Sequence, residues 1–167
     1  MNPAPVDYLG GYPEELRDKA LRARREGTLE RRLLERYPLG HEITTNAALY
    51  DFAQGIKREH LRSSPPLAKV RYHDKLSTLH KAFGLHTYAV RVQGANLKSQ
   101  NEIRIASLFK ELPLAFLRMV VVHELAHLRH KEHDKAFYRL CEHMEPDYVR
   151  YELDLRLLLF ARQPDQA

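Results

Sequence analysis

Helical spacing of apolar residues predicts three helices in the first part of the chain, over about Pro13–Arg25, Leu29–Tyr37 and Thr45–Arg62. The third shows the pattern most fully, because its apolar positions lie three or four residues apart: Leu49, Phe52, Ala53 and Ile56. Thr44 or Thr45 is expected to be its N-cap, since a threonine hydroxyl accepts a hydrogen bond from a free N–H of the first turn. The run of two serines and two prolines at residues 63–66 then ends the helix.

The middle of the chain combines one helical pattern with two alternating ones. A helix is expected from Asp74 to about Phe83, closed by Gly84. The segments Thr87–Gln93 and Glu102–Ala106 alternate apolar with polar residues, as half-buried strands do. Because the residues between them favour turns, we expect two antiparallel strands joined by a loop, and therefore a small antiparallel sheet.

A helix opening at Pro113 is expected to be buried on most sides. Its apolar residues cover nearly the whole circumference: Phe116, Leu117, Val120, Val121, Val122, Leu125 and Leu128. Asp134 is expected to cap a following helix with an apolar stripe, and Pro146 to separate a last helix. The sequence therefore predicts an α+β protein with many helices and little sheet.

The length of 167 residues suits one catalytic unit with a real core. We expect residues 1–66 to form an N-terminal helical region packed on a catalytic domain of residues 67–167, the two making one compact unit. The turn at residues 63–66 is short enough to be an ordinary connection rather than a domain boundary.

The positive charge is concentrated in the middle of the chain. Residues 67–118 carry 9 Lys/Arg against 3 Asp/Glu, whereas residues 119–167 carry 7 against 9. This distribution favours a partner that tolerates or prefers negative charge, although a generally basic surface would explain it equally well. The sequence contains no nucleic-acid-binding motif, and its longest apolar run, Leu114–Val122, is too short to span a membrane and is interrupted by Arg118.

Cys141 is the only cysteine, so no disulfide can form within the chain and no cysteine-rich metal site is available. Residues 1–12 contain no apolar stretch of the kind that secretory signals need. Both features favour the reducing cytoplasm as the compartment of the protein.

His123, Glu124 and His127 form an H-E-x-x-H motif within the expected buried helix. Residues i and i+4 project from one side of a helix, so two imidazoles can bind one metal ion while Glu124 reaches its bound water. The alternative is an amphipathic helix that happens to carry two histidines and a solvated glutamate.

His133 is the preferred third ligand, and His130 is its rival. Three imidazoles would leave the fourth tetrahedral position open, as in catalytic rather than structural zinc sites. Metzincin peptidases place their third histidine at the spacing of His133, with glycine at the bend where this chain has His130. The other histidines, at positions 41, 60, 73, 80, 86 and 143, lack partner spacing and are expected to be ordinary surface or half-buried residues.

Three further residues have a candidate role that the sequence does not decide. Met144 could lie beneath the metal, but its place on a regular apolar stripe favours core packing. Tyr148 and Tyr151 could each donate a hydrogen bond to an oxyanion, and nothing in the sequence distinguishes between them.

The chemistry that this motif implies is metal-assisted hydrolysis. The ion would activate a water molecule while Glu124 accepts its proton and later delivers it to the leaving group. Three imidazoles favour Zn²⁺ over Mg²⁺, which prefers oxygen ligands. A strand beside the site could bind an extended peptide, with Arg91, Lys98 and Arg104 as candidate substrate-binding residues.

These residues resemble the YgjP-like metallopeptidase family, which is related to the SprT-like and WLM zincins. The resemblance rests on the runs Phe116–Leu128, Glu132–Tyr138 and His143–Pro146, and extends back through Glu102–Arg104, Arg91–Gly94 and Gly84–Thr87 to Gly11–Glu14. The broader family often has an Arg-Trp-Gly-Ser-Cys stretch before the strand, whereas this chain has no tryptophan and carries Arg91-Val92-Gln93-Gly94 there. Substrate handling at that place is therefore expected to differ.

The resemblance implies a minimal zincin-like α+β domain in which His123, His127 and His133 bind zinc and Glu124 is the catalytic acid/base. It supports a cytoplasmic zinc metallopeptidase acting on peptides or proteins. Proteins similar to this one have also been described as pyrophosphatases acting on UTP, so a nucleotide is the alternative substrate. A zinc-stabilised binding module is a third hypothesis, against which Glu124 and the open coordination position both count.

Overall fold

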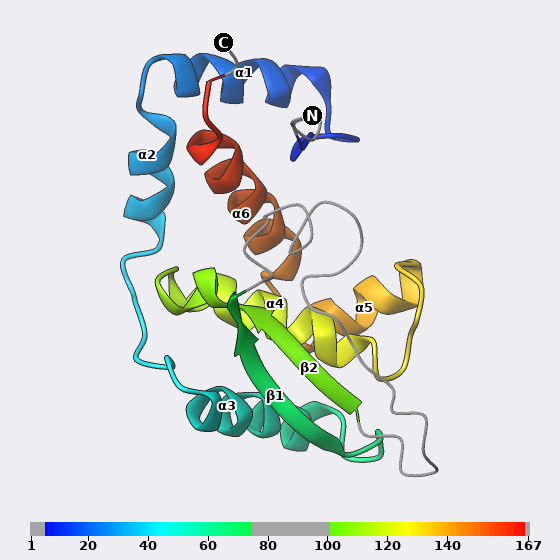
Figure 1. Ribbon diagram of the computed structural model, residues 1–167. Helices are drawn as coiled ribbons and strands as arrows, with labels where there is room; N and C mark the ends of the chain where they lie inside the picture. The colour runs from blue at the N-terminus through cyan, green and yellow to red at the C-terminus, as the bar shows by residue number, and fades with distance from the viewer. Residues whose placement is uncertain (1–5, 75–100, 166–167) are drawn as a thin grey trace, which may run out of the picture.

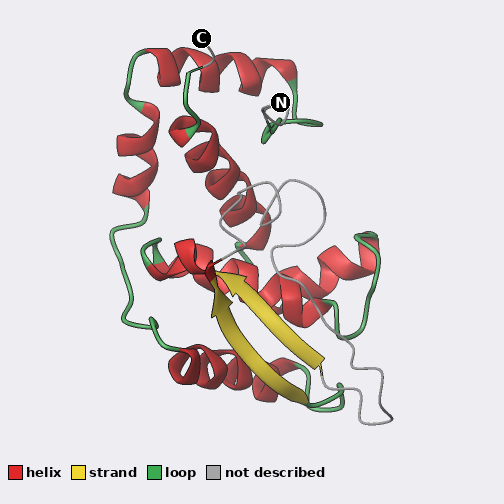
Figure 2. Cartoon of the chain, viewed as in Figure 1, coloured by secondary structure: helices red, strands yellow, loops and turns green. Residues whose placement is uncertain are grey.

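A computed structural model describes residues 6–74 and 101–165 of the chain. Helices and two strands account for most of these residues (Figure 2). In chain order the elements are α1 (Glu14–Arg25), α2 (Leu29–Arg36), α3 (Asn46–His60), β1 (Leu67–His73), β2 (Asn101–Ala106), the 3₁₀ helix η3 (Ser107–Lys110), α4 (Leu114–Ala126), α5 (Lys135–Met144) and α6 (Tyr148–Arg162). The α+β class is therefore confirmed.

Helix α4 is the centre of the arrangement. It packs against α3, α5 and α6, and against η3 and β2 (Figure 1). The strands lie across α4, α3 packs on β1, and α6 runs from α4 towards α1. Ten of the thirteen residues of α4 are buried. The prediction that this helix is surrounded by the core is thus confirmed.

Local signals account for where several helices begin and end. Gly27 follows α1 at φ +70°, a left-handed conformation that glycine adopts at low cost, and its N–H bonds to the carbonyl of Arg24 at 2.9 Å. Thr45 caps α3 by accepting a hydrogen bond from the N–H of Ala48 at 3.1 Å. Asp134 caps α5 in the same way. The predicted bounds of these helices agree with the structure within two residues.

The sheet differs from the prediction, because β1 and β2 run parallel. Both arrowheads lie at the same end of the pair (Figure 2). The expectation of a small antiparallel sheet is therefore wrong for the strands that the structure describes. Parallel neighbours need a long crossover, and residues 74–100 separate the two strands in sequence. The expected strand Thr87–Gln93 and the expected helix after Asp74 lie outside the described residues.

Strand β1 was not expected from the sequence. Its register against β2 shifts between Leu67 and Lys69, which is a bulge or irregularity in the ladder. Consequently Leu67 and Val70 are both buried although they are three residues apart. A strand with this irregularity loses the strict two-residue alternation by which strands are recognised.

The N-terminal helices contact the later elements through α2, which packs on α6, and through α3, which packs on β1 and α4. A polar contact between α2 and α6 is buried: the hydroxyl of Tyr37 donates a hydrogen bond to the Asp154 carboxylate, which is only 2% exposed. Arg36 lies 3.5 Å from the same carboxylate. Because a buried charge needs such partners, this contact ties α2 to α6.

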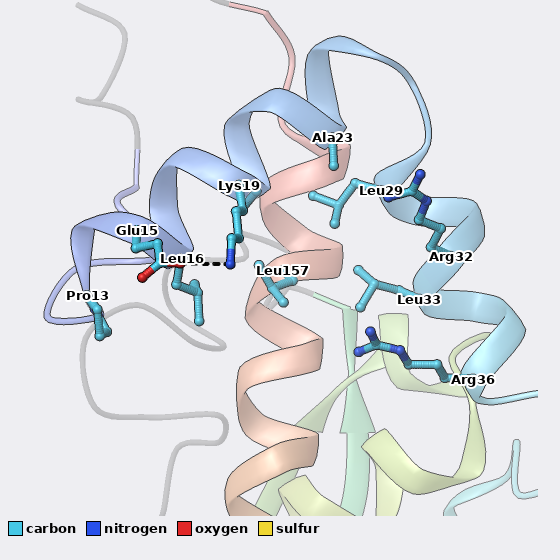
Figure 3. A pocket seen from close by; sticks show the side chains of 11 residues that line it. Pro13, Glu15, Leu16, Lys19, Ala23, Leu29, Arg32, Leu33, Arg36 and Leu157 are labelled. Carbon is cyan, nitrogen blue, oxygen red and sulfur yellow. Dashed lines mark ion pairs between the residues drawn. The ribbon is translucent and has the colours of Figure 1, made fainter.

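A hollow of about 490 Å³ lies between α1, α2 and α6 (Figure 3), and no residue of the H-E-x-x-H motif lines it. Its apolar lining residues are Leu16, Ala20, Ala23, Leu29, Leu33 and Leu157. Glu15 and Lys19 form an ion pair of 2.8 Å at its rim, and Arg32 and Arg36 line it from α2. The described residues that line this hollow include no histidine, cysteine or aspartate, so it offers no set of metal ligands. Within residues 6–74 and 101–165, every helix is too short or too polar to cross a membrane.

Candidate metal centre

Helix α4 presents the first two histidines of the motif on one face. It ends at Ala126, so His123 lies in its last turn and His127 directly follows it. The Nε2 atoms of these two imidazoles are 3.2 Å apart. The spacing of i and i+4 therefore brings the two rings together, as the sequence predicts.

His133 returns to the same point from the turn between α4 and α5. Its Nε2 lies 3.2 Å from that of His123 and 3.1 Å from that of His127. Three imidazole nitrogens from two parts of the chain thus converge. Within the described residues, these three histidines are the one group of at least three potential metal ligands whose ligand atoms lie together.

The spacing of the three nitrogens fits a tetrahedral metal ion. Zn–N bonds of about 2.0 Å at tetrahedral angles would place the ligand nitrogens about 3.3 Å apart. The observed separations of 3.1 to 3.2 Å are close to that value. The donor set is also suitable, because neutral imidazoles are ligands of zinc and related transition metals.

Two of these rings make a hydrogen bond through Nδ1, the outer nitrogen, which faces away from the point where the Nε2 atoms converge. Nδ1 of His127 lies 2.9 Å from the carbonyl oxygen of His130, which can only accept, so Nδ1 carries the proton and Nε2 the lone pair. Nδ1 of His123 lies 2.7 Å from the hydroxyl of Tyr148. These contacts aim the Nε2 lone pairs towards the point where the rings converge.

His123 lies deepest of the three and is only 2% exposed. Burial, and then the charges that His127 and His133 would carry if protonated, hold the pKa of His123 well below its ordinary value. The imidazole is therefore neutral near pH 7, which is the form that binds a metal ion.

The ring of Phe137 packs against all three imidazole rings. Its side chain is fully buried, and its ring centroid lies 4.9 Å from His123, 4.7 Å from His127 and 4.9 Å from His133. In the sequence, Phe137 is one position of the apolar stripe expected in the helix after Asp134. Its contact with all three rings depends on how α5 packs against α4, and no local sequence pattern reveals that packing.

Glu124 lies between the two helical histidines and is only 2% exposed. Its position in the sequence places it about 100° around α4 from His123. A buried glutamate beside converging imidazoles is unusual in a helix whose other buried residues are nearly all apolar. This combination is typical of a site that handles protons next to a metal ion.

His130 does not join the other three histidines, since its contact with the group is through its backbone carbonyl. Met144 belongs to the hydrophobic core, which agrees with the preferred interpretation of its stripe. Tyr148 is fully buried, with its hydroxyl at the outer nitrogen of His123. Tyr151 instead packs edge-on against Tyr37, with ring centroids 5.7 Å apart. Neither tyrosine has the geometry expected for an oxyanion donor on the open side of a metal.

Of the three candidate substrate-binding residues, only Arg104 lies in the described part of the chain. It is on β2, where its Nε lies 3.1 Å from a carboxylate oxygen of Glu102, and Arg71 of β1 lies 2.6 Å from the same oxygen. Partial burial acts to raise the pKa of Glu102, but the hydrogen bonds and charges of Arg104 and Arg71 hold it below its ordinary value. Arg91 and Lys98 lie outside the described residues.

Three converging imidazoles beside a buried glutamate are an arrangement typical of metal-dependent hydrolases. The family model described as "YgjP-like, metallopeptidase domain" matches residues 23–157, and the chain belongs to this family. It is 50% identical, over 154 residues that cover 92% of each chain, to a protein of Escherichia coli (strain K12) named UTP pyrophosphatase. Family and relative alike identify the chain as a hydrolase. No solved structure matches it.

Proposed function

We propose that this protein is a zinc-dependent hydrolase in which His123, His127 and His133 bind the ion and Glu124 is the general base. The observation that carries this proposal is the convergence of three Nε2 atoms to separations of 3.1 to 3.2 Å. Such close approach of three imidazoles without a cation would set nitrogen lone pairs against one another.

Each residue of the site has one role in this proposal. Zinc, when bound, lowers the pKa of a water molecule and polarises the bond to be cleaved. Glu124 takes the proton of that water and delivers it to the leaving group. The three histidines leave one tetrahedral position for water or substrate, which a structural site would fill with a fourth protein ligand.

A peptide or protein is the first candidate substrate. The H-E-x-x-H helix with a third histidine is the arrangement that metallopeptidases use, and the matching family model is described as a metallopeptidase domain. A glutamate that both accepts and donates the proton suits amide hydrolysis, because the leaving amine must be protonated.

UTP is the second candidate substrate, and one specific observation favours it. The E. coli relative named UTP pyrophosphatase is 50% identical and matches over 92% of both chains. The excess of Lys/Arg over Asp/Glu in residues 67–118 would also suit a triphosphate. In this reaction water would attack the α-phosphorus and release pyrophosphate, with Glu124 again taking the proton of the water.

One experiment separates these candidates. Wild-type protein and a Glu124→Gln variant, both loaded with zinc, would be assayed for cleavage of a peptide library and for pyrophosphate release from UTP. Activity that falls by about 10²- to 10⁴-fold in the variant while zinc is retained identifies the reaction of this site. The same loss for both substrates would mean that one centre performs both reactions.

Two outcomes would count against the proposal. An activity equal in wild type and Glu124→Gln would remove Glu124 from the mechanism. Zinc bound by a wild type that is inactive in both assays would leave a zinc-stabilised binding module as the better account.

The division into an N-terminal helical region and a catalytic domain, and the cytoplasm as compartment, also remain proposals. The buried contact of Tyr37 with Asp154 supports the first in the form of one compact unit. Cys141 is free and buried, as expected in a reducing compartment. Urea unfolding followed by fluorescence and by circular dichroism would give coincident transitions if the unit is single.

A further inference from the structure

We propose that Tyr148 is a positioning residue for the metal centre: it holds the His123 ring so that Nε2 faces the ion. This inference rests on the proposed function, since it concerns the same zinc ligands. The hydroxyl of Tyr148 lies 2.7 Å from Nδ1 of His123, 25 residues earlier in the chain. Tyr148 is the first residue of α6, so this bond links the start of that helix to the centre.

The geometry of the two rings supports a directed hydrogen bond rather than simple packing. Their planes differ by only 18° and their centroids are 6.4 Å apart. The hydroxyl therefore meets the edge of the imidazole, where the N–H lies, and not its face. Both side chains are almost completely buried, so water does not compete for this bond.

The direction of the hydrogen bond between Tyr148 and His123 follows from the ligand role of Nε2. With Nε2 on the ion, Nδ1 carries the proton of the ring, so Nδ1–H donates and the hydroxyl oxygen of Tyr148 accepts. The same hydroxyl makes a side-chain hydrogen bond with Cys141. Burial raises the pKa of the Cys141 thiol, so the thiol stays neutral.

His127 has a corresponding partner of a different kind. Its Nδ1–H donates to the backbone carbonyl of His130, a contact that no side-chain substitution removes directly. Of the two hydrogen bonds described for Nδ1 atoms, only that of His123 therefore has a side chain as its partner. Replacing Tyr148 by phenylalanine would delete one oxygen atom and retain the ring that packs in the core.

The test is the zinc affinity of metal-free Tyr148→Phe protein, measured by competition with a chelator. Partners of metal-ligating histidines typically contribute 10- to 100-fold in affinity, so we expect a loss of that size. The Co²⁺-substituted protein should also show a changed visible absorption spectrum, because the field of one ligand is altered. Tyr151→Phe is the matched control, since it deletes a hydroxyl on the same helix that does not touch the centre, and it should bind zinc as wild type does.

A Cys141→Ala variant probes the same contact without altering Tyr148. It removes the hydrogen-bonding partner of the hydroxyl on the side away from His123, so we expect a smaller loss of zinc affinity in the same direction. If Tyr148→Phe binds zinc within twofold of wild type, with an unchanged Co²⁺ spectrum, the positioning role is wrong while the proposed function stands. If wild type itself binds no zinc, the proposed function fails, and the inference fails with it.

Discussion

Nε2 of His133 lies 3.1 Å from Nε2 of His127, although His133 comes six positions later in the chain, in the turn between α4 and α5. The turn between them is fixed at both ends, by the hydrogen bond from His127 to the carbonyl of His130 and by the cap of Asp134 on α5. A fixed turn places the third imidazole without a large entropic cost when the ion binds.

The first prediction compares the two histidines of this turn. His133→Ala should lose tight zinc binding, because it deletes one of three ligands, whereas His130→Ala should retain it, because the carbonyl remains. Chelator competition on the two metal-free proteins measures the difference. If His130→Ala loses tight zinc binding and His133→Ala retains it, His130 rather than His133 is the third ligand.

The second prediction concerns Phe137, which packs against the three imidazole rings. Phe137→Ala should lower the free energy of unfolding by about 3 to 5 kcal/mol, the usual cost of deleting a buried phenylalanine, and should weaken zinc binding as well. Urea denaturation of the metal-free protein measures the first effect. Phe160→Ala is the control, since Phe160 is only partly buried beneath Arg24 and should cost less. Equal losses in the two variants would contradict this role of Phe137.

The third prediction uses two N-caps of the same kind. Asp134 accepts from the N–H of Phe137 at 2.9 Å and Thr45 from that of Ala48 at 3.1 Å. Replacing either residue by alanine should cost about 1 kcal/mol of unfolding free energy. Only Asp134→Ala should also weaken zinc binding, because only that cap holds the turn with His133. A similar loss of affinity in Thr45→Ala would show that the effect is not local.

The fourth prediction is a loss of stability at high pH. Burial, and then the hydrogen bond to Asp154, raise the pKa of Tyr37 to about 12, and burial raises those of Tyr8 and Tyr72 to about 12 as well. Unfolded tyrosine loses its proton near pH 10, so the unfolded state releases protons first as the pH rises. The stability that these groups contribute is therefore complete below about pH 10 and is lost between about pH 10 and 12.

Urea denaturation between pH 9 and 12 measures this loss. Tyr37→Phe should be less stable than wild type at pH 8, because Asp154 loses a buried donor, but its stability should fall less steeply above pH 10. Parallel pH profiles of the two proteins would show that Tyr37 does not titrate in this way.

The helices could be predicted from the sequence because their signals are local. Apolar spacing and caps such as Thr45 and Asp134 act within one or two turns, and the structure places these ends within two residues of expectation. Strand β1 could not be found in this way. Its irregularity between Leu67 and Lys69 breaks the alternation, and its partner β2 is more than 25 residues away.

The parallel pairing of β1 and β2 could not be predicted from local patterns either. Turn-forming residues before Glu102 suggested an antiparallel neighbour, but pairing is decided by which strand the chain brings alongside, and Val70 lies opposite Ile103 in a parallel register. Strand pairing depends on contacts distant in sequence, which a local pattern does not encode.

The three converging histidines could be predicted from the sequence, but the residues that pack against them could not. His123 and His127 follow from the helical repeat, and His133 from a known ligand spacing. Tyr148 and Phe137 reach the same centre from α6 and α5. Their contribution arises from packing between helices, so the sequence could name Tyr148 as a candidate but suggested a different role for it.

Direct titration of the metal-free protein with Zn²⁺ by calorimetry tests the central claim most directly. The account predicts one ion per chain, bound tightly by wild type and by Glu124→Gln, with tight binding abolished in His123→Ala and His127→Ala. A folded wild-type protein, with His123, His127 and His133 intact, that binds no transition metal would contradict it.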